Sequence, residues 1–278
     1  MLKALSPRGN LQAFYELTLL LTKYRQLTLE MARRELSDRY AGQFFGAFWT
    51  IGHPLTLMLV FVFIFGFVFK MKLGGTHEMP LDYTTYLLSG LIPWLAFAES
   101  MSKASSVIVG NANLVKQVVF PIEVLPVKGV IVSIFTQCIF LGLLTVYVLV
   151  SQQTLHWTYA LIPVLTFLQV LAMIGVSYIL SAIGVYFRDV KDFVQVFSTV
   201  GVYLMPIFYL PEAVPKVFRV ALYANPFSYL IWCYQDVLYF GRFVHGWAWL
   251  IFAAMSLGVF VIGYRLFRKL KLMFGNVL

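Results

Sequence analysis

Six long apolar stretches dominate this chain and restrict what it can fold into. A helix needs about 20 mostly apolar residues to cross the hydrocarbon of a bilayer, and each stretch comes close to that length or exceeds it. Of the 278 residues, 60% are hydrophobic and 12% are charged, whereas about a quarter of the residues in a soluble domain are charged. The sequence therefore predicts an all-α, polytopic membrane protein whose single domain covers residues 1–278. The six predicted transmembrane helices are 48–69, 84–109, 125–150, 158–187, 193–210 and 246–267.

The distribution of basic residues predicts the orientation of these spans. Six spans place both termini on the same side of the membrane, and that side then holds most of the 21 Lys and Arg residues. The opposite side holds only Lys70, Lys72, Lys216, Arg219 and Arg242. Because cytoplasmic loops accumulate Lys and Arg, both termini are predicted to be cytoplasmic. The net charge of +9 thus indicates membrane topology, and no nucleic-acid partner is expected.

Two segments do not fit a simple span. Residues 14–34 carry apolar side chains at helical spacing on one face, which predicts an amphipathic helix along the cytoplasmic interface. A helix that packs on a neighbour without contacting lipid is the alternative. Residues 211–242, on the external side, contain two apolar pieces that are too short to span and are punctuated by prolines. Such pieces suit re-entrant helices, whose irregular backbone must be surrounded by protein or by a water-filled cavity.

Residue patterns that would support catalysis do not occur in the sequence. The four histidines are scattered, and no HExxH, GxSxG or GxxxxGK[ST] motif is present. Asp189 and Asp192 are spaced to chelate a cation, but the neighbouring Arg188 and Lys191 favour a solvated helix end. We therefore expect no catalytic residues, no metal site and no cofactor bound by this chain. Cys138 and Cys233 fit no disulfide or metal spacing and are interpreted as packing residues.

One predicted span contains two charges of opposite sign. Glu99 and Lys103 lie four residues apart, so they share a helix face and can form an ion pair. Ionisable groups inside a membrane are candidates for a functional role. Both a structural pair and a role in a transport pathway remain open at this point.

Five segments, in this order and spacing, resemble the membrane-spanning subunit of type 2 ABC exporters. Within that group the chain is most similar to permeases for lipid-linked polysaccharides such as O-antigen or capsule, and teichoic-acid exporter permeases are also similar. The resemblance covers about residues 14–268. The segments are YAGQFFGAFWTIGHPLTLMLVFVFIFG (40–66), NANLVKQVVFPIEVLPV (111–127), YFRDVKDFVQVFS (186–198), MPIFYLPEAVP (205–215) and ANPFSYLIWCYQDVLYFG (224–241).

The resemblance implies a half-transporter in the bacterial cytoplasmic (inner) membrane. Two copies of the chain would form a homodimer, with the first and fifth spans at the seam, and would assemble with two copies of a nucleotide-binding ATPase subunit. ATP and Mg²⁺ would bind to that partner. The substrate would be a lipid-linked glycan that moves outward.

The resemblance also implies that residues 111–124 form a coupling helix that docks on the ATPase. Such a segment has to be short and stiffly attached, and prolines limit the backbone freedom at its exit. A simple connecting loop is the alternative. The predicted coupling residues are Asn113, Leu114, Lys116, Gln117, Phe120, Pro121 and Glu123.

Two further sets of residues are candidates for contact with such a substrate. Arg33, Arg34 and Arg39 could bind the pyrophosphate of a lipid carrier, or they could bind anionic lipid or enforce topology. Aromatic rings suit the apolar faces of sugars, although Trp and Tyr also gather at membrane interfaces and in packed cores. The candidate aromatic residues of the glycan pathway are Tyr203, Phe208, Tyr209, Phe227, Tyr229, Trp232 and Tyr234.

Three other functions compete with polysaccharide export. A drug or small-lipid exporter would share the fold. An integral membrane glycosyl- or acyltransferase would need acids or histidines clustered at one aqueous site. A self-sufficient carrier would need internal repeats and an ion site.

Overall fold

A computed structural model describes residues 7–68, 81–117, 121–153 and 155–277. All the regular secondary structure in these ranges is helical. The predicted helices 111–124 and 48–69 extend into residues 118–120 and 69, which lie outside the described part. The helices are α1 (Pro7–Lys23), α2 (Arg25–Arg39), η2 (Gly46–Phe48), α3 (Trp49–Phe61), η3 (Val62–Val68), α4 (Tyr83–Gly110), α5 (Ala112–Gln117), α6 (Val124–Gln152), η4 (Trp157–Leu161), α7 (Ile162–Tyr186), α8 (Val190–Leu204), η5 (Pro211–Ala213), α9 (Lys216–Ala224), α10 (Pro226–Gln235), η6 (Asp236–Phe240), α11 (Gly246–Lys271) and α12 (Phe274–Val277).

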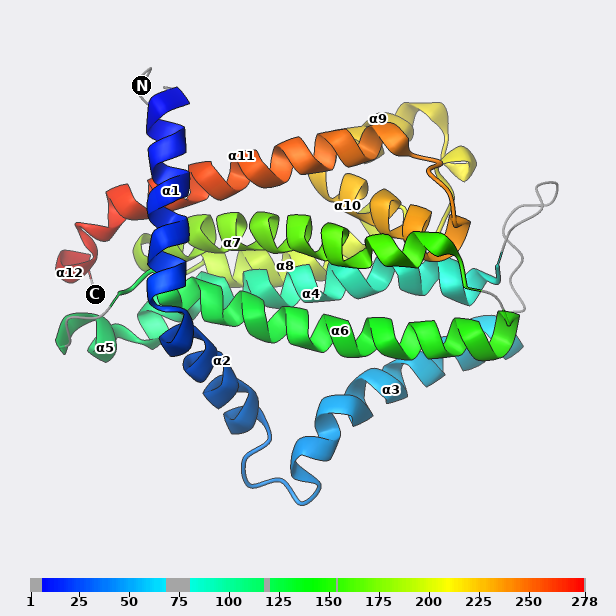
Figure 1. The fold of residues 1–278 in the computed structure, drawn as a ribbon, viewed down its shortest axis with the longest axis horizontal. Coiled ribbons are helices and arrows are strands. Elements are labelled where there is room, and N and C mark those ends of the chain that lie inside the picture. The colour runs from blue at the N-terminus through cyan, green and yellow to red at the C-terminus, as the bar shows by residue number, and fades with distance from the viewer. Residues whose placement is uncertain (1–6, 69–80, 118–120, 154, 278) are drawn as a thin grey trace.

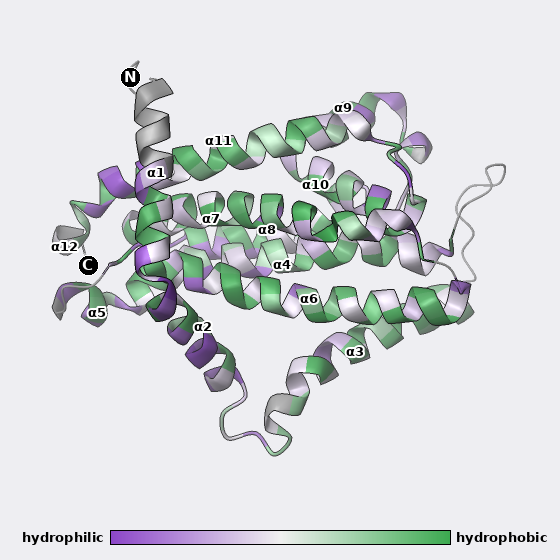
Figure 2. Ribbon diagram, viewed as in Figure 1, coloured by the Kyte–Doolittle hydropathy of each residue, from purple (hydrophilic) through white to green (hydrophobic). Residues whose placement is uncertain are grey.

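Five long helices, α4, α6, α7, α8 and α11, form an elongated bundle (Figure 1). One end of the bundle carries α5, α12 and the C-terminus, and the opposite end carries α9; these are named here the α5 end and the α9 end. Helices α1 and α2 cross the bundle near its α5 end, and α3 diverges from the other helices. Apolar residues cover the bundle between its ends, whereas hydrophilic residues gather on α2 and near α12 (Figure 2).

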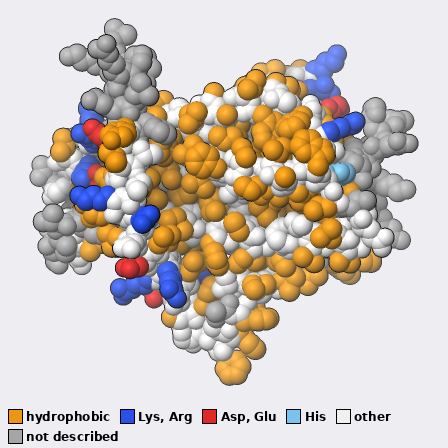
Figure 3. Space-filling model, viewed as in Figure 1, with side chains coloured by type: hydrophobic (Ala, Val, Ile, Leu, Met, Phe, Trp, Pro, Cys, Tyr) orange, Lys and Arg blue, Asp and Glu red, His pale blue; other side chains and the backbone are white. Residues whose placement is uncertain are grey.

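Four helical segments in the described part are long and apolar enough to cross a membrane. They are Trp49–Val68, Val124–Gln152, Trp157–Tyr186 and Gly246–Lys271, and they match the predicted first, third, fourth and sixth spans. Figure 3 shows hydrophobic side chains over the middle of the molecule and charged side chains towards its ends and over α2. This distribution suits a protein whose central belt lies in lipid.

The second predicted span is the helix α4, which is long but carries charged and small polar residues. Every residue from Tyr83 to Trp94 is buried, and α4 packs against α6, α7, α8 and α10. The burial explains the composition, because a helix enclosed by other helices does not need a lipid-like surface.

Two predicted boundaries differ from the structure for local reasons. The segment 14–34 was expected to be one helix, but it is divided into α1 and α2 at Tyr24, whose φ of −101° and ψ of 20° are not helical. The fifth predicted span, 193–210, corresponds to α8, which ends at Leu204. Met205 is extended, with a ψ of 156°, because the ring of the following Pro206 disfavours a helical conformation there.

The backbone that follows α8 is irregular but does not lack hydrogen-bond partners. The Tyr86 hydroxyl donates to the carbonyl oxygens of Pro206 and Tyr209 at 3.2 and 3.0 Å. Gln235 Nε2 donates to Pro206 O at 2.7 Å, and the Tyr83 hydroxyl donates to Phe208 O at 2.8 Å. Side chains of α4 and α10 thus satisfy carbonyls that would be costly to leave unpaired away from water.

Helices α7 and α11 are in backbone contact at a pair of glycines. A Cβ atom at Gly263 would overlap the carbonyl oxygen of Gly175, and a Cβ atom at Gly175 would overlap the backbone of Val259. Small residues allow two helices to approach this closely. In lipid the hydrophobic effect does not drive helices together, so the van der Waals contacts between them stabilise the pair. The two helices therefore form a tightly packed pair.

Candidate functional site

Helix α5 has one face attached to the bundle and one face that is free. Leu114 and Val115 are half-buried and pack against the hydrophobic core. Asn113 and Lys116 are exposed. Two of the predicted coupling residues therefore face outward at the α5 end, and Leu114 holds the helix in place from the other side.

Glu123 of the predicted coupling segment faces inward. It is only 5% exposed, and its Oε1 accepts a hydrogen bond from Nζ of Lys271 in α11 at 2.7 Å. The hydroxyl of Tyr178 in α7 donates to the Glu123 carbonyl at 3.0 Å. Glu123 was expected to offer a polar contact to a partner protein, but these bonds engage it within its own chain.

The other coupling residues lie around this turn. Pro121 begins a turn before α6, in which the Val124 amide donates to the Pro121 carbonyl at 3.0 Å. Gln117 is the last residue of α5. Phe120 lies outside the described residues.

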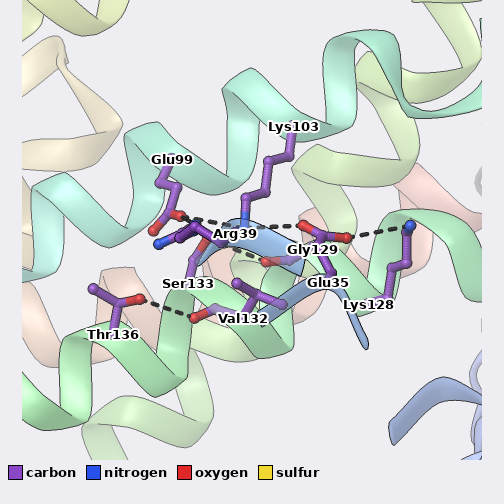
Figure 4. Close-up of polar contacts among 9 residues, drawn as sticks. All are labelled: Glu35, Arg39, Glu99, Lys103, Lys128, Gly129, Val132, Ser133 and Thr136. Atoms are coloured by element: carbon purple, nitrogen blue, oxygen red, sulfur yellow. Dashed lines mark hydrogen bonds and ion pairs between the residues drawn. The ribbon is translucent and has the colours of Figure 1, made fainter. Parts of the chain in front are cut away.

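Five charged side chains from three helices form a cluster near the α5 end (Figure 4). Glu35 of α2 receives one ammonium group on each carboxylate oxygen, with Lys103 at 3.1 Å and Lys128 at 3.2 Å. Glu99 pairs with Lys103 at 3.2 Å and with Arg39. The expected Glu99–Lys103 pair is thus present, and it belongs to a network, the α2 cluster, that fastens α2 to α4 and α6.

The electrostatics of the α2 cluster favour the charged forms of Glu35 and Arg39. Burial raises the pKa of the Glu35 carboxyl, but the ammonium groups of Lys103 and Lys128 outweigh it, so the pKa falls below the usual 4.5. Burial alone would lower the pKa of the Arg39 guanidinium. The carboxylate of Glu99 has the opposite and larger effect, so the pKa of Arg39 is raised above its usual value. A lowered carboxyl pKa means that the stabilisation is complete above pH 4.5 and is lost as the pH falls through the lower folded value.

The three predicted phosphate-binding arginines have different surroundings. Arg39 is bound to Glu99 in the α2 cluster. Arg33 and Arg34 are exposed, and Arg34 has only a long contact of 3.7 Å to Asp38, with side-chain exposures of 84% and 67%. Such an exposed pair is weak, so Arg33 and Arg34 are accessible to an anion.

The predicted aromatic residues fall into an accessible group and a packed group. Tyr203 is 64% exposed and stacks on Phe208, with 5.5 Å between the ring centroids. The Tyr209 hydroxyl donates to the Tyr203 carbonyl at 3.0 Å. These three residues therefore lie together where α8 meets the irregular segment.

The remaining four aromatic residues belong to α10. Phe227 packs edge-on against Trp94 and Phe97, with centroid distances of 5.3 and 5.0 Å. Tyr229 contacts Trp232, which is fully buried. Tyr234 is also fully buried, and its hydroxyl donates to Gln169 Oε1 at 2.6 Å.

Sequence reasoning missed Glu35, Lys128 and Lys271. Their partners lie far away in the chain, so no spacing rule could pair them. The available signal was the presence of Glu99 and Lys103 in an apolar span, because ionisable groups at that depth require partners from other helices.

Metal-binding residues do not gather anywhere in the part of the chain that the structure describes, where no three His, Cys, Asp or Glu side chains could hold an ion together. Cys138 is exposed and Cys233 is buried, and both are free thiols.

Comparison with known proteins identifies similar sequences over nearly the whole chain. The family of the ABC-2 type transporter matches residues 26–239. An O-antigen export system permease protein RfbA of Klebsiella pneumoniae is 27% identical over 254 residues, which cover 91% of this chain and 95% of that protein. The RfbA permease of Myxococcus xanthus is 29% identical over 240 residues, which cover 85% of this chain and 89% of that protein.

Proposed function

Because the chain belongs to the ABC-2 type transporter family, we propose that it is the transmembrane subunit of an ATP-driven exporter of a lipid-linked polysaccharide. Two copies of the chain assemble with two copies of a separate ATPase subunit, which binds ATP and Mg²⁺. The family match over residues 26–239 carries this proposal. The similar O-antigen export permeases support an O-antigen-like glycan as the substrate.

In this proposal the chain crosses the bacterial cytoplasmic membrane six times, with the α5 end and both termini in the cytoplasm. Four apolar helical segments support the first, third, fourth and sixth spans. Helix α4 and helix α8, continued by residues 205–210, provide the second and fifth spans. Helices α9 and α10 form the external re-entrant region, which is supported by the burial of α10 and the exposure of Val217, Phe218 and Val220 in α9.

ATP-driven closure of the ATPase pair pushes on α5 in this mechanism. Asn113 and Lys116 contact the partner, and Leu114 transmits the displacement to the bundle. Because the α2 cluster ties α2 to α4 and α6, the interface helix moves with these spans. The two copies then separate along α3 and α8 and open a path for the glycan.

The accessible residues of the two candidate sets contact the substrate. Arg33 and Arg34 bind the pyrophosphate of the lipid carrier at the cytoplasmic surface, since a guanidinium group suits phosphate oxygens. The rings of Tyr203, Phe208 and Tyr209 offer weak stacking surfaces to successive sugars.

Charge reversal at Lys116 tests the coupling assignment. The chain is co-expressed with its proposed ATPase subunit, and Lys116→Glu is expected to reduce co-purification at least tenfold, because Lys116 lies on the exposed face of α5. Lys216→Glu, which reverses an exposed charge on α9, serves as the control and should co-purify normally. Undiminished recovery of the ATPase with Lys116→Glu would contradict the assignment.

The substrate is tested in vesicles that contain both subunits. ATP hydrolysis is expected to rise when a lipid-linked glycan is added and to stay unchanged with hydrophobic drugs. Stimulation by the drugs alone would instead indicate the small-lipid or drug exporter.

A further inference from the structure

The last turns of α11 meet the turn that follows α5. Lys271 of α11 binds the carboxylate of Glu123 at 2.7 Å. Side-chain exposure is 32% for Lys271 but only 6% for Glu123. A carboxylate this deeply buried depends on its cation, because it has lost most of its water. The pair is therefore a firm link between α11 and the exit of the coupling segment.

Neighbouring contacts hold the same end of α11 in place. The Tyr186 hydroxyl of α7 donates to the Leu270 carbonyl at 3.2 Å, and Arg268 forms an ion pair with Glu16 of α1. The Tyr178 hydroxyl also reaches the Glu123 carbonyl. Helix α7, the turn that precedes α6 and helix α1 thus converge on the last turn of α11.

The opposite end of α11 is bound by a second buried carboxylate. Asp236 begins η6, directly after α10, and is 1% exposed. Its Oδ2 accepts hydrogen bonds from the His245 amide at 3.0 Å and from the Trp249 ring nitrogen at 3.3 Å. Its Oδ1 lies 2.9 Å from His245 Nδ1. The start of α11 is therefore fixed to the short helices at the α9 end.

The stretch between these two links is stiff. Helix α11 has 26 residues and contains no proline, and a rise of 1.5 Å per residue gives it a length of roughly 39 Å. Its backbone contact with α7 at Gly175 and Gly263 leaves little room for bending. A displacement applied at one end is consequently passed along the whole helix.

The geometry points to α11 as the element that carries the displacement of α5 to the re-entrant helices at the α9 end, with Lys271 and Glu123 as its positioning residues. The inference rests on the proposed function, in which α5 receives the ATP-driven push. It adds a route that leaves the chain at Glu123, the N-cap of α6, and does not run along the length of α4 or α6. The push enters α11 through Lys271 and leaves it through the contacts of Asp236.

A fluorophore at the α9 end reports whether the displacement arrives. Both subunits are reconstituted in lipid vesicles, with Cys138 replaced by Ser and a labelled cysteine in place of Val217, which is 81% exposed on α9. The change in emission on adding ATP and vanadate is measured together with ATP hydrolysis. Lys271→Gln is expected to reduce the emission change at least fivefold while ATP hydrolysis and co-purification of the ATPase persist.

Two variants distinguish the loss of the Lys271–Glu123 ion pair from the loss of a positive charge and from misfolding. Lys269→Gln removes the same charge from an exposed site two residues away and should keep the wild-type emission change. Glu123→Met removes the carboxylate without leaving a buried charge, so it should fold normally and still lose the signal. A full emission change in folded Glu123→Met overturns the inference alone. Failure of the wild-type chain to bind the ATPase overturns the proposed function and the inference together.

Discussion

At the residue scale, burial distinguishes aromatic side chains that the sequence places in one group. Tyr203 is 64% exposed, whereas Tyr234 has no exposed surface. The Tyr234 hydroxyl accepts from Gln137 Nε2 at 2.8 Å and donates to Gln169 at 2.6 Å, and the two glutamine amides also bond to each other. Tyr203 can therefore touch a substrate directly, while Tyr234 completes a polar network that joins α6, α7 and α10.

Substitutions at Tyr234 and Tyr203 should consequently impair different properties, stability in the first case and export in the second. Tyr234→Phe removes one hydrogen-bond partner from each glutamine, which costs about 1–3 kcal/mol for buried groups and lowers Tm in detergent. Tyr203→Ala should leave Tm unchanged but slow export, and Tyr203→Phe, which keeps the ring, should restore it. Normal Tm with poor export in Tyr234→Phe would contradict this assignment.

Residue-scale contacts were also the hardest to predict from sequence. The pairs Arg39–Glu99 and Lys271–Glu123 join residues 60 and 148 positions apart, and hydropathy carries no information about such distances. The Glu99–Lys103 pair could be predicted because one helical turn separates its members.

At the element scale, the apolar stretches predicted most helices because the length and polarity of a span are local properties. The break at Tyr24 was missed, since neither proline nor glycine stands there. Pro206 indicated that α8 would end before it, but the prediction of a span over 193–210 followed the length of the apolar stretch. The contact between α7 and α11 could not be predicted, because glycines at many other positions of the chain have no close neighbour.

Substitution at this helix crossing should separate α7 from α11. In Gly263→Ala the new methyl group would collide with the Gly175 carbonyl, so we expect a destabilisation of about 1–3 kcal/mol, as in overpacked cores, measured as a lower Tm. Gly258→Ala lies on the same helix with nothing within 4 Å of the added atom and should keep the wild-type Tm. Equal Tm values for both variants would rule out a tight crossing.

At the scale of the whole molecule, both helices of the proposed seam, α3 and α8, have apolar faces that the bundle does not cover. Only 17% of the apolar stretch within Trp49–Val68, which comprises α3 and η3, is buried. On α8, Phe193, Val196 and Val200 are 71%, 63% and 47% exposed. Lipid could cover both faces, but in the proposed assembly a second copy of the chain does so.

Disulfide cross-linking can detect that second copy. With Cys138 replaced by Ser, Val196→Cys should form cross-linked dimers on oxidation in membranes, because α8 lies at the proposed seam. Val164→Cys, on the exposed part of α7 at 54% exposure, should remain monomeric. Cross-linking at Val164 in preference to Val196 would place the seam elsewhere.

The enclosed position of α4 has a consequence for biogenesis. This helix contains Pro93, Glu99 and Lys103, and a translocon that partitions each segment by its own hydrophobicity would retain it poorly. Its charges pair with Arg39 and Glu35 of α2, which are synthesised earlier. Glu35 in turn pairs with Lys128 of α6, which is synthesised later. The network of ion pairs around α4 is therefore complete only after α6 has emerged from the ribosome, so we expect this central helix to be stably inserted as part of a group.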